Sequence, residues 1–378
     1  MEILHPIFII ILLILIVGSY IEFNTEKRKK PLMFYVVASV LLIIACGFRG
    51  YVGADYGVYR SMYTGFSIHV DYRDVFEKAI FKQNNLDIEW IFVLINKFLF
   101  DLQQPFYIVT FVIVTISLLL KSSFFIKYSP IPTLSLLMLY MPLFLIAESG
   151  QMRQAVGSSF AIYGLHYAIK RKFFMYLLFF YLAIGFHKTN FIFFPAYWLI
   201  RINLNKNKII VLIVVSILLS PFELYNYAGG ILDFMAPQDV SSGFDGYVND
   251  SQFGTQMGFQ KTDILYIFMI LLLIYYNDTA CEKIYYYEYF RNLAVFGFCI
   301  FYLVKGNKIF AIRLPGIYMF FGITMVMPAI AYAVKERFRS CSVYFMVIVY
   351  SLYMTYSFTS NNGKRANFTI DRYDNYLW

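Results

Sequence analysis

The sequence predicts an all-α polytopic membrane protein with about twelve transmembrane helices. Of its 378 residues, 60% are hydrophobic and only 15% are charged, and its mean hydropathy is +0.61. A soluble domain carries about 25% charged residues, so this chain has more apolar surface than a water-exposed fold can bury. Apolar runs such as "IFIIILLILIVGSYI" approach the roughly 20 residues that cross a bilayer. These runs are continuous rather than alternating, which predicts helical spans instead of barrel strands.

The predicted spans cover most of the chain, which is expected to form a single transmembrane domain over residues 1–378. Their approximate ranges are 3–21, 32–48, 105–121, 131–147, 154–169, 173–187, 190–201, 208–222, 263–277, 291–305, 314–334 and 340–358. The first run lacks a preceding positive charge and a small-residue cleavage site. It is therefore predicted to be a retained helix rather than a cleaved signal peptide.

Basic residues cluster in short connections, and their placement predicts the topology. The clusters lie at 27–30, 170–172, 201–208 and 335–339. Alternation of the spans puts all of them on one side, which the positive-inside rule assigns to the cytoplasm. The net charge of +9 therefore predicts an oriented membrane protein and no nucleic-acid partner. Three other segments become external: 49–104, 223–262 and the tail after 358.

Two external segments carry features of their own. The long loop 223–262 is rich in Gly, Asp, Asn and aromatic residues, which fits either contact with a glycan or a simple covering loop. Segment 86–102 has apolar residues at helical spacing, interrupted by Glu89 and a few other polar residues. It is short for a span and too apolar for a free loop, so an interfacial or re-entrant external helix is predicted.

Polar side chains converge on the external face under this topology. Arg49 and Asp55 follow the second span, and Glu89 lies in the segment 86–102. Arg153 and Gln154 precede the fifth span. His187 and Lys188 lie at a hairpin tip, and Asn307 and Arg313 lie near the tenth span. Each has a plain explanation: an arginine can reach the headgroups, Asp55 can pair with Arg49, and Glu148 can pair with Arg153. Their joint clustering at the membrane edge instead predicts a functional site.

The residue types predict the chemistry of this site. Arginine binds phosphate oxygens in pairs and stays charged at any working pH, so three arginines favour a lipid diphosphate. Such a leaving group needs charge stabilisation rather than a general acid. An acceptor hydroxyl needs a base, for which His187, Asp55 and Glu89 all qualify by type. The four cysteines are far apart in the sequence and lack metal spacing, so neither a disulfide nor a zinc site is predicted.

Four stretches in this order resemble the EpsG family of Wzy-like polysaccharide polymerases. They are "FRGYVGADYGVY" from Phe48, "DIEWIFVLINKFL" from Asp87, the region from "SGQMRQAVGSS" to "AIGFHKTNF", and "NKIFAIRLPGIYMFF" from Asn307. The first and third are the most specific. The chain departs from the family pattern after Glu89, where Trp90 replaces the usual Pro or Gly.

The resemblance implies a GT-C-like membrane glycosyltransferase of the bacterial inner membrane, with its active site facing the periplasm or exterior. Such enzymes join undecaprenyl-diphosphate-linked repeat units into O antigen, capsule or exopolysaccharide, without a metal or other cofactor. The resemblance leaves open whether a chain-length regulator protein binds to this chain. The implied diphosphate ligands are Arg49, Arg153 and Arg313. His187 is the first choice of base with Asp55 as rival, Tyr56 and Tyr59 line a sugar subsite, and Glu89, Gln154, Lys188 and Asn307 complete the substrate site.

Other classes remain as alternatives. A polysaccharide ligase shares the logic of arginines and a histidine, and only the family motifs separate it from a polymerase. A membrane sugar acyltransferase would draw on a cytoplasmic acyl donor, so its polar site should face inward. A flippase for lipid-linked glycans would carry charges deep within several spans and inverted repeats, and neither is evident in the sequence.

Overall fold

The computed structural model describes residues 3–25, 31–82, 88–223, 258–334, 344–345, 348–350, 352–353, 356 and 367–377. Within these ranges the chain is helical and has no strand, apart from two isolated bridges. The prediction of an all-α fold is confirmed there. The predicted loop 223–262, the basic clusters 27–30 and 335–339, and the span 340–358 fall wholly or largely outside the described residues.

Most helices follow the predicted apolar runs, but those at 56–69 and 72–79 lie in the external segment 49–104, where no span was predicted. The α-helices are α1 (Pro6–Asn24), α2 (Met33–Gly47), α3 (Tyr56–His69), α4 (Tyr72–Ala79), α5 (Trp90–Asp101), α6 (Phe106–Tyr128), α7 (Pro132–Leu139), α8 (Leu145–Gly150), α9 (Met152–Ile169), α10 (Phe173–Phe186), α11 (Ala196–Leu199), α12 (Lys206–Leu219), α15 (Lys261–Lys283), α16 (Tyr287–Leu303), α17 (Lys308–Arg313), α18 (Gly316–Phe321) and α19 (Met327–Ala333). Two 3₁₀ helices, η3 (Lys188–Phe193) and η4 (Ser220–Phe222), and two π-helices, η2 (Tyr140–Phe144) and η6 (Gly322–Val326), complete the described elements.

Four described helical stretches are long and apolar enough to cross a membrane. They are Pro6–Asn24, Phe106–Tyr128, Thr262–Lys283 and Phe310–Ala333, and Met33–Gly47 and Phe173–Phe186 are shorter apolar helices. The outer faces of α12 and α15 expose large aliphatic side chains, such as Val211, Leu218 and Leu271. Such faces are costly in water but match the hydrocarbon of a bilayer. The chain is therefore an all-α membrane protein; the number of twelve spans stays a prediction.

Segment 190–201 is not the single continuous helix that the sequence predicts. It forms η3 and then the four-residue helix α11, because Pro195 between them has no N–H to continue a helical ladder. The segment nevertheless runs the length of the bundle. His187 precedes it beside the start of α9, and the Arg201 guanidinium at its far end donates to the Ala168 carbonyl at the end of α9.

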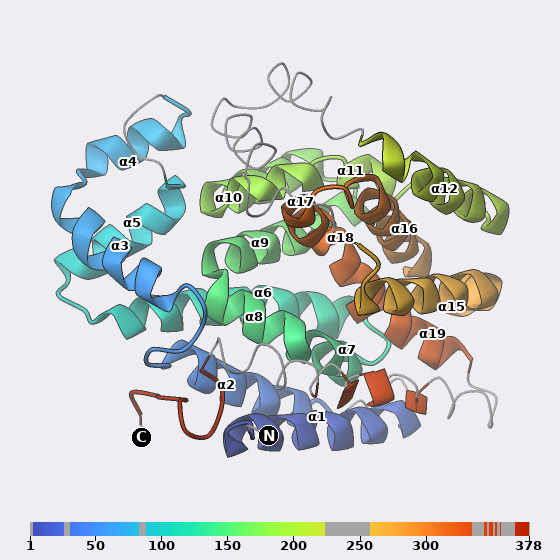
Figure 1. Ribbon diagram of the computed structural model, residues 1–378, viewed down its shortest axis with the longest axis horizontal. Coiled ribbons are helices and arrows are strands. Elements are labelled where there is room, and N and C mark those ends of the chain that lie inside the picture. The colour runs from blue at the N-terminus through green and yellow to red at the C-terminus, as the bar shows by residue number, and fades with distance from the viewer. Residues whose placement is uncertain are drawn as a thin grey trace.

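The helices form a bundle with a separate layer at one end. Figure 1 shows α1, α6, α9 and α10 lying roughly parallel, while α3, α4 and α5 gather beyond one end of them. This layer has its own small core, in which Tyr59, Phe92 and Phe106 pack with residues of α9 and α10. Segment 86–102 forms α5 within this layer, so the predicted helix is confirmed; its interfacial placement stays a prediction.

The described end of the chain returns to this same end of the bundle. The Gly50 N–H donates to the Asp374 carbonyl at 2.8 Å, and the Tyr376 N–H donates to the Phe48 carbonyl at 2.8 Å. The His5 N–H likewise donates to the Phe368 carbonyl at 3.0 Å. Three segments that the topology places on the external side (the start of α1, the turn after α2 and residues 367–377) are thus in direct contact.

Candidate active site

Five of the predicted site residues come together at the end of the bundle that bears α3 to α5. Asp55 lies in the turn before α3, Glu89 precedes α5, Arg153 is in the first turn of α9, His187 follows α10, and Arg313 ends α17. Two hydrogen bonds to Glu89 and the mutual electrostatic influence of these groups establish their proximity. The predicted convergence of these segments therefore occurs.

Glu89 is the centre of the hydrogen-bonded part of the site. Its Oε2 lies 2.7 Å from Nη1 of Arg153, and its Oε1 accepts the backbone N–H of Lys188 at 3.0 Å. Burial by itself would raise the pKa of Glu89, but the neighbouring His187, Arg153 and the Lys188 amide hold it below its usual value. Glu89 is consequently an ionised anchor that joins the start of α9 to the start of η3, and it is a weak base.

Arg153 has part of its guanidinium committed and part uncommitted. Nη1 pairs with Glu89, and the guanidinium carbon lies 5.9 Å from the ring centroids of both Tyr59 and Phe92. Its Nε is buried without a hydrogen-bond partner among the described residues. A buried donor without a partner is costly, so an anion that accepts from this edge of the fork would be favoured.

His187 is held in a defined protonation state. Its Nδ1 accepts the Thr189 backbone N–H at 3.2 Å and lies 2.8 Å from the Thr189 hydroxyl. Burial lowers its pKa to about 4; Glu89 opposes this shift, while Arg153 and Arg313 add to it. His187 is therefore neutral near pH 7, and its proton must sit on Nε2 because the backbone N–H occupies Nδ1.

This tautomer bears on the expected role of His187. A base must offer a lone pair to the acceptor hydroxyl. The Nδ1 lone pair of His187 is engaged with Thr189, and Nε2 presents an N–H instead. In this arrangement Nε2 of His187 is a hydrogen-bond donor, and the role of base expected from the sequence stays a prediction.

Asp55 is the carboxylate with free lone pairs. It is half-buried and, within the described part of the chain, its carboxylate accepts no hydrogen bond and forms no ion pair. Burial raises the pKa of Asp55, and the positive charges of Arg313 and Arg153 oppose this shift. An aspartate with a raised pKa and unengaged oxygens is the stronger base of the two carboxylates.

Arg49 points into the protein and away from the cluster. It is fully buried, and its guanidinium donates to the carbonyls of Cys46, Val52 (3.1 Å) and Ser149 (3.3 Å), with Met152 Sδ at 2.8 Å. Its donors are therefore satisfied by the turn after α2 and by the end of α8. In this arrangement Arg49 holds together the segment that leads to Asp55, and its described hydrogen bonds go to none of the five clustered residues.

Position 53, in the turn before Asp55, requires a glycine. Its φ is +102°, and a Cβ there would lie 2.1 Å from the Ser149 carbonyl oxygen. A side chain is excluded both by backbone conformation and by space. The close approach of Gly53 to Ser149 fixes the turn against α8 directly before Asp55.

The remaining predicted site residues lie around the cluster with different degrees of access. Tyr56 and Tyr59 are buried in the core of the α3–α5 layer, so neither side chain is open to solvent in this arrangement. Asn307 is buried, and its Oδ1 accepts the Phe310 N–H at 3.2 Å, so it caps the first turn of α17. Gln154 is half-buried and, among the described residues, makes no hydrogen bond through its amide. Lys188 contributes its backbone N–H to Glu89.

Glu148 pairs with Lys121 and not with Arg153, contrary to the expectation from the sequence. The Lys121 Nζ lies 2.5 Å from Glu148 Oε1, which also accepts from Ser117 at 2.8 Å. Lys121 and Glu148 are 4% and 0% exposed, on α6 and α8. This buried ion pair was not anticipated from the sequence. Lys121 stands out in the sequence as the one charge inside "FVIVTISLLLKSSFF".

Thr189 was not anticipated from the sequence. It sits in the tripeptide His187-Lys188-Thr189, where a hydroxyl residue two positions after a histidine can bond back to it. The spacing of two residues between His187 and Thr189 is the one feature of the sequence that could have predicted this hydrogen bond. Among the described residues, no group of three or more His, Cys, Asp or Glu lies close enough to hold a metal ion.

The fold and the site define a class of protein. The chain is an all-α membrane protein that gathers two arginines, two carboxylates and a neutral histidine at one end of its helix bundle. The family model described as "EpsG family" matches residues 32–374, nearly the whole chain, so the protein belongs to the EpsG family. This is a family of Wzy-like polysaccharide polymerases. Comparisons with curated proteins and with solved structures gave no significant match.

Proposed function

We propose that this protein is a membrane glycosyltransferase that polymerises undecaprenyl-diphosphate-linked oligosaccharide repeat units into a surface polysaccharide. The growing glycan leaves its lipid diphosphate and is joined to a sugar hydroxyl of a fresh lipid-linked unit. The bond from the anomeric carbon to the diphosphate breaks, a bond to the acceptor oxygen forms, and the hydroxyl proton goes to a base. The site acts on the outer side of the bacterial inner membrane.

The observation that carries this proposal is the arginine-bearing cluster in a chain of the EpsG family. The guanidinium of Arg153 has a buried Nε without a hydrogen-bond partner among the described residues. The positive charges of Arg153 and Arg313 both lower the pKa of Asp55 and of His187. Arginine forks bind diphosphate oxygens and stabilise the charge that develops as the diphosphate leaves. We assign these two arginines to the diphosphate and Arg49 to positioning of the Asp55 turn.

Asp55 is the base in this proposal. Its pKa is raised by burial and its oxygens are unengaged among the described residues, whereas both oxygens of Glu89 already accept hydrogen bonds. His187 donates its Nε2 proton in a hydrogen bond to an oxygen of the diphosphate or the sugar. Glu89 orients Arg153 and the turn that carries His187.

The test is the size distribution of surface polysaccharide in a deletion strain complemented with variants. Arg153→Ala, Asp55→Asn and His187→Ala should each remove long chains while single repeat units remain attached to their carrier. Arg60→Ala is the matched control, because Arg60 is an exposed arginine on α3 outside the cluster.

Protein amount in the membrane is measured for every variant. Full-length chains made by a normally expressed Arg153→Ala protein would overturn the role of the arginine cluster. Accumulation of long unligated polymer in the deletion strain would instead identify a ligase.

A further inference from the structure

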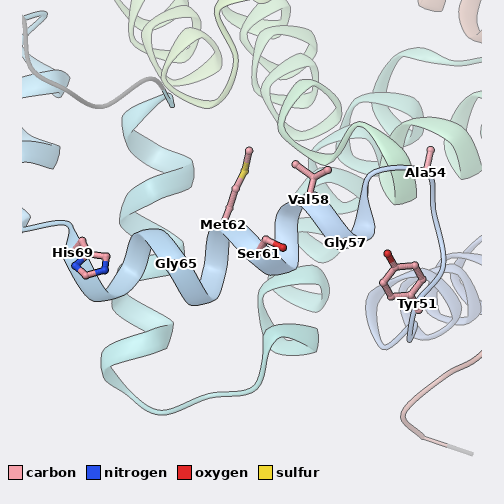
Figure 2. A pocket seen from close by; sticks show the side chains of 8 residues that line it. All are labelled: Tyr51, Ala54, Gly57, Val58, Ser61, Met62, Gly65 and His69. Carbon is pink, nitrogen blue, oxygen red and sulfur yellow. The ribbon is translucent and has the colours of Figure 1, made fainter.

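A groove lies along α3, next to the proposed catalytic base. Its volume is about 780 Å³, and it extends from Tyr51, in the turn before α3, to His69 at the end of the helix. Figure 2 shows Val58 and Met62 projecting from the same side of α3, with Ser61 beside them. Pockets of roughly 300–1,000 Å³ hold ligands of drug size, so the groove has room for an oligosaccharide.

The lining of this groove is neutral and mixed in character. Among the described residues that line it, none is Asp, Glu, Lys or Arg. Val58 and Met62 supply apolar contact, Tyr51 and Ser61 supply hydroxyl groups, and His69 supplies an imidazole. A sugar presents apolar C–H faces and hydroxyl groups at once, which this combination matches. A polyprenyl chain has no group to bond to these hydroxyls and the imidazole, and burying them unpaired against it would be unfavourable.

The groove ends one residue before the proposed base, although Asp55 is not itself among its lining residues. Ala54 lines its near end and is the residue directly before Asp55. The acceptor hydroxyl must reach the Asp55 carboxylate, so the sugars attached to it have to leave from this point. The groove along α3 offers a path that begins beside Asp55, and the described residues that line it carry no Asp, Glu, Lys or Arg side chain.

We propose that the groove lined by Tyr51, Ser61, Gly65 and His69 is the binding site for the oligosaccharide of the acceptor unit. The inference rests on the proposed function and deepens it, since it assigns the sugar subsite to this face of α3 in place of Tyr56 and Tyr59. A neutral oligosaccharide of about one repeat unit is the ligand class.

The test fills the groove without disturbing the fold. A Cβ at Gly65 would meet no atom within 4 Å, and the residue is exposed in the middle of α3. Gly65→Trp therefore places a ring in the groove, and tryptophan has a better helix propensity than glycine. Thr64→Trp is the matched control, because Thr64 is an exposed neighbour on the same helix and does not line the groove.

Binding is measured on purified protein in nanodiscs, with two probes. One is the repeat-unit oligosaccharide released by mild acid from the lipid-linked pool of the host, and the other is undecaprenyl monophosphate. Gly65→Trp should weaken oligosaccharide binding by about tenfold or more, Thr64→Trp should bind as the wild type does, and binding of undecaprenyl monophosphate should be unchanged in both.

Three results would overturn the proposal: an unchanged affinity of Gly65→Trp for the oligosaccharide, a loss confined to undecaprenyl monophosphate, or no oligosaccharide binding by the wild type. The second result would mark the groove as the path of the lipid chain. Because binding is measured without turnover, failure of this inference is separable from failure of the proposed polymerase, which the polysaccharide of Arg153→Ala reports.

Discussion

Replacing Gly53 by alanine tests the geometry that places the catalytic turn. The residue has φ +102°, and a Cβ would lie 2.1 Å from the carbonyl oxygen and 2.7 Å from the carbonyl carbon of Ser149. The same oxygen accepts a hydrogen bond from Nη2 of Arg49 at 3.3 Å. The clash is with backbone, so it cannot be relieved by rotating a side chain.

The expected cost has two parts. A non-glycine residue with positive φ costs about 1–2 kcal/mol, and forcing an extra methyl group into a packed site costs about 1–3 kcal/mol. The sum of about 2–5 kcal/mol is a large share of the roughly 5–15 kcal/mol that stabilises a folded protein. Any backbone shift that relieves the clash also displaces Asp55, which is two residues further on.

Thermal unfolding of purified protein in detergent and the size distribution of surface polysaccharide measure the two consequences. Gly53→Ala should unfold several degrees below the wild type and lose long polysaccharide. Gly65→Ala is the control, because its Cβ meets nothing within 4 Å, and it should gain up to about 1 kcal/mol from helix propensity. If Gly53→Ala matches the wild type in both assays, or if Gly65→Ala loses as much stability, the reasoning is refuted.

Two further predictions concern buried ionisable groups. Lys121→Met leaves the buried charge of Glu148 without its partner and should lower the free energy of unfolding by about 3–5 kcal/mol. Lys121→Met combined with Glu148→Gln should recover most of that loss, as measured by thermal unfolding. Equal loss of stability in the single and double variants would contradict the pairing. His187 has a folded pKa of about 4 against 6.5 ordinarily, so the unfolded chain takes up its proton first as pH falls. Stability should therefore decrease between about pH 6.5 and 4 and by less in His187→Gln; an identical pH dependence of unfolding in the two proteins would show that His187 is not held neutral.

The membrane class and the segments that form the site could be predicted from the sequence. Hydropathy is a local property that accumulates along a run of residues, so α1, α2, α6, α9 and α10 follow the predicted apolar runs, whereas the more polar α3 and α4 were not predicted. Alternation of spans then groups segments that lie far apart in the chain. For this reason Asp55, Glu89, Arg153, His187 and Arg313 were expected on one face, and the structure brings them to one end of the bundle.

The direction of individual side chains was decided only by the tertiary structure. Arg49 turns inward because carbonyls of Val52 and Ser149 lie within reach of its guanidinium, and Ser149 is 100 positions away in the chain. Glu148 on α8 pairs with Lys121 on α6, whereas Arg153 pairs with Glu89. Neither the direction of the Arg49 side chain nor the partner of Glu148 can be predicted from the spacing of residues within one segment.

The sequence by itself thus determined that this is a membrane protein, that its spans are helical, and which polar segments meet at one end of the bundle. These follow from the free energy of transferring apolar runs and charges, which composition and order fix. The tertiary structure decided which arginines face the site, where the proton of His187 sits and which carboxylate stays free. These depend on contacts of a few ångströms between segments distant in the chain, and a hydrogen bond from Thr189 or a close approach at Gly53 is enough to settle them.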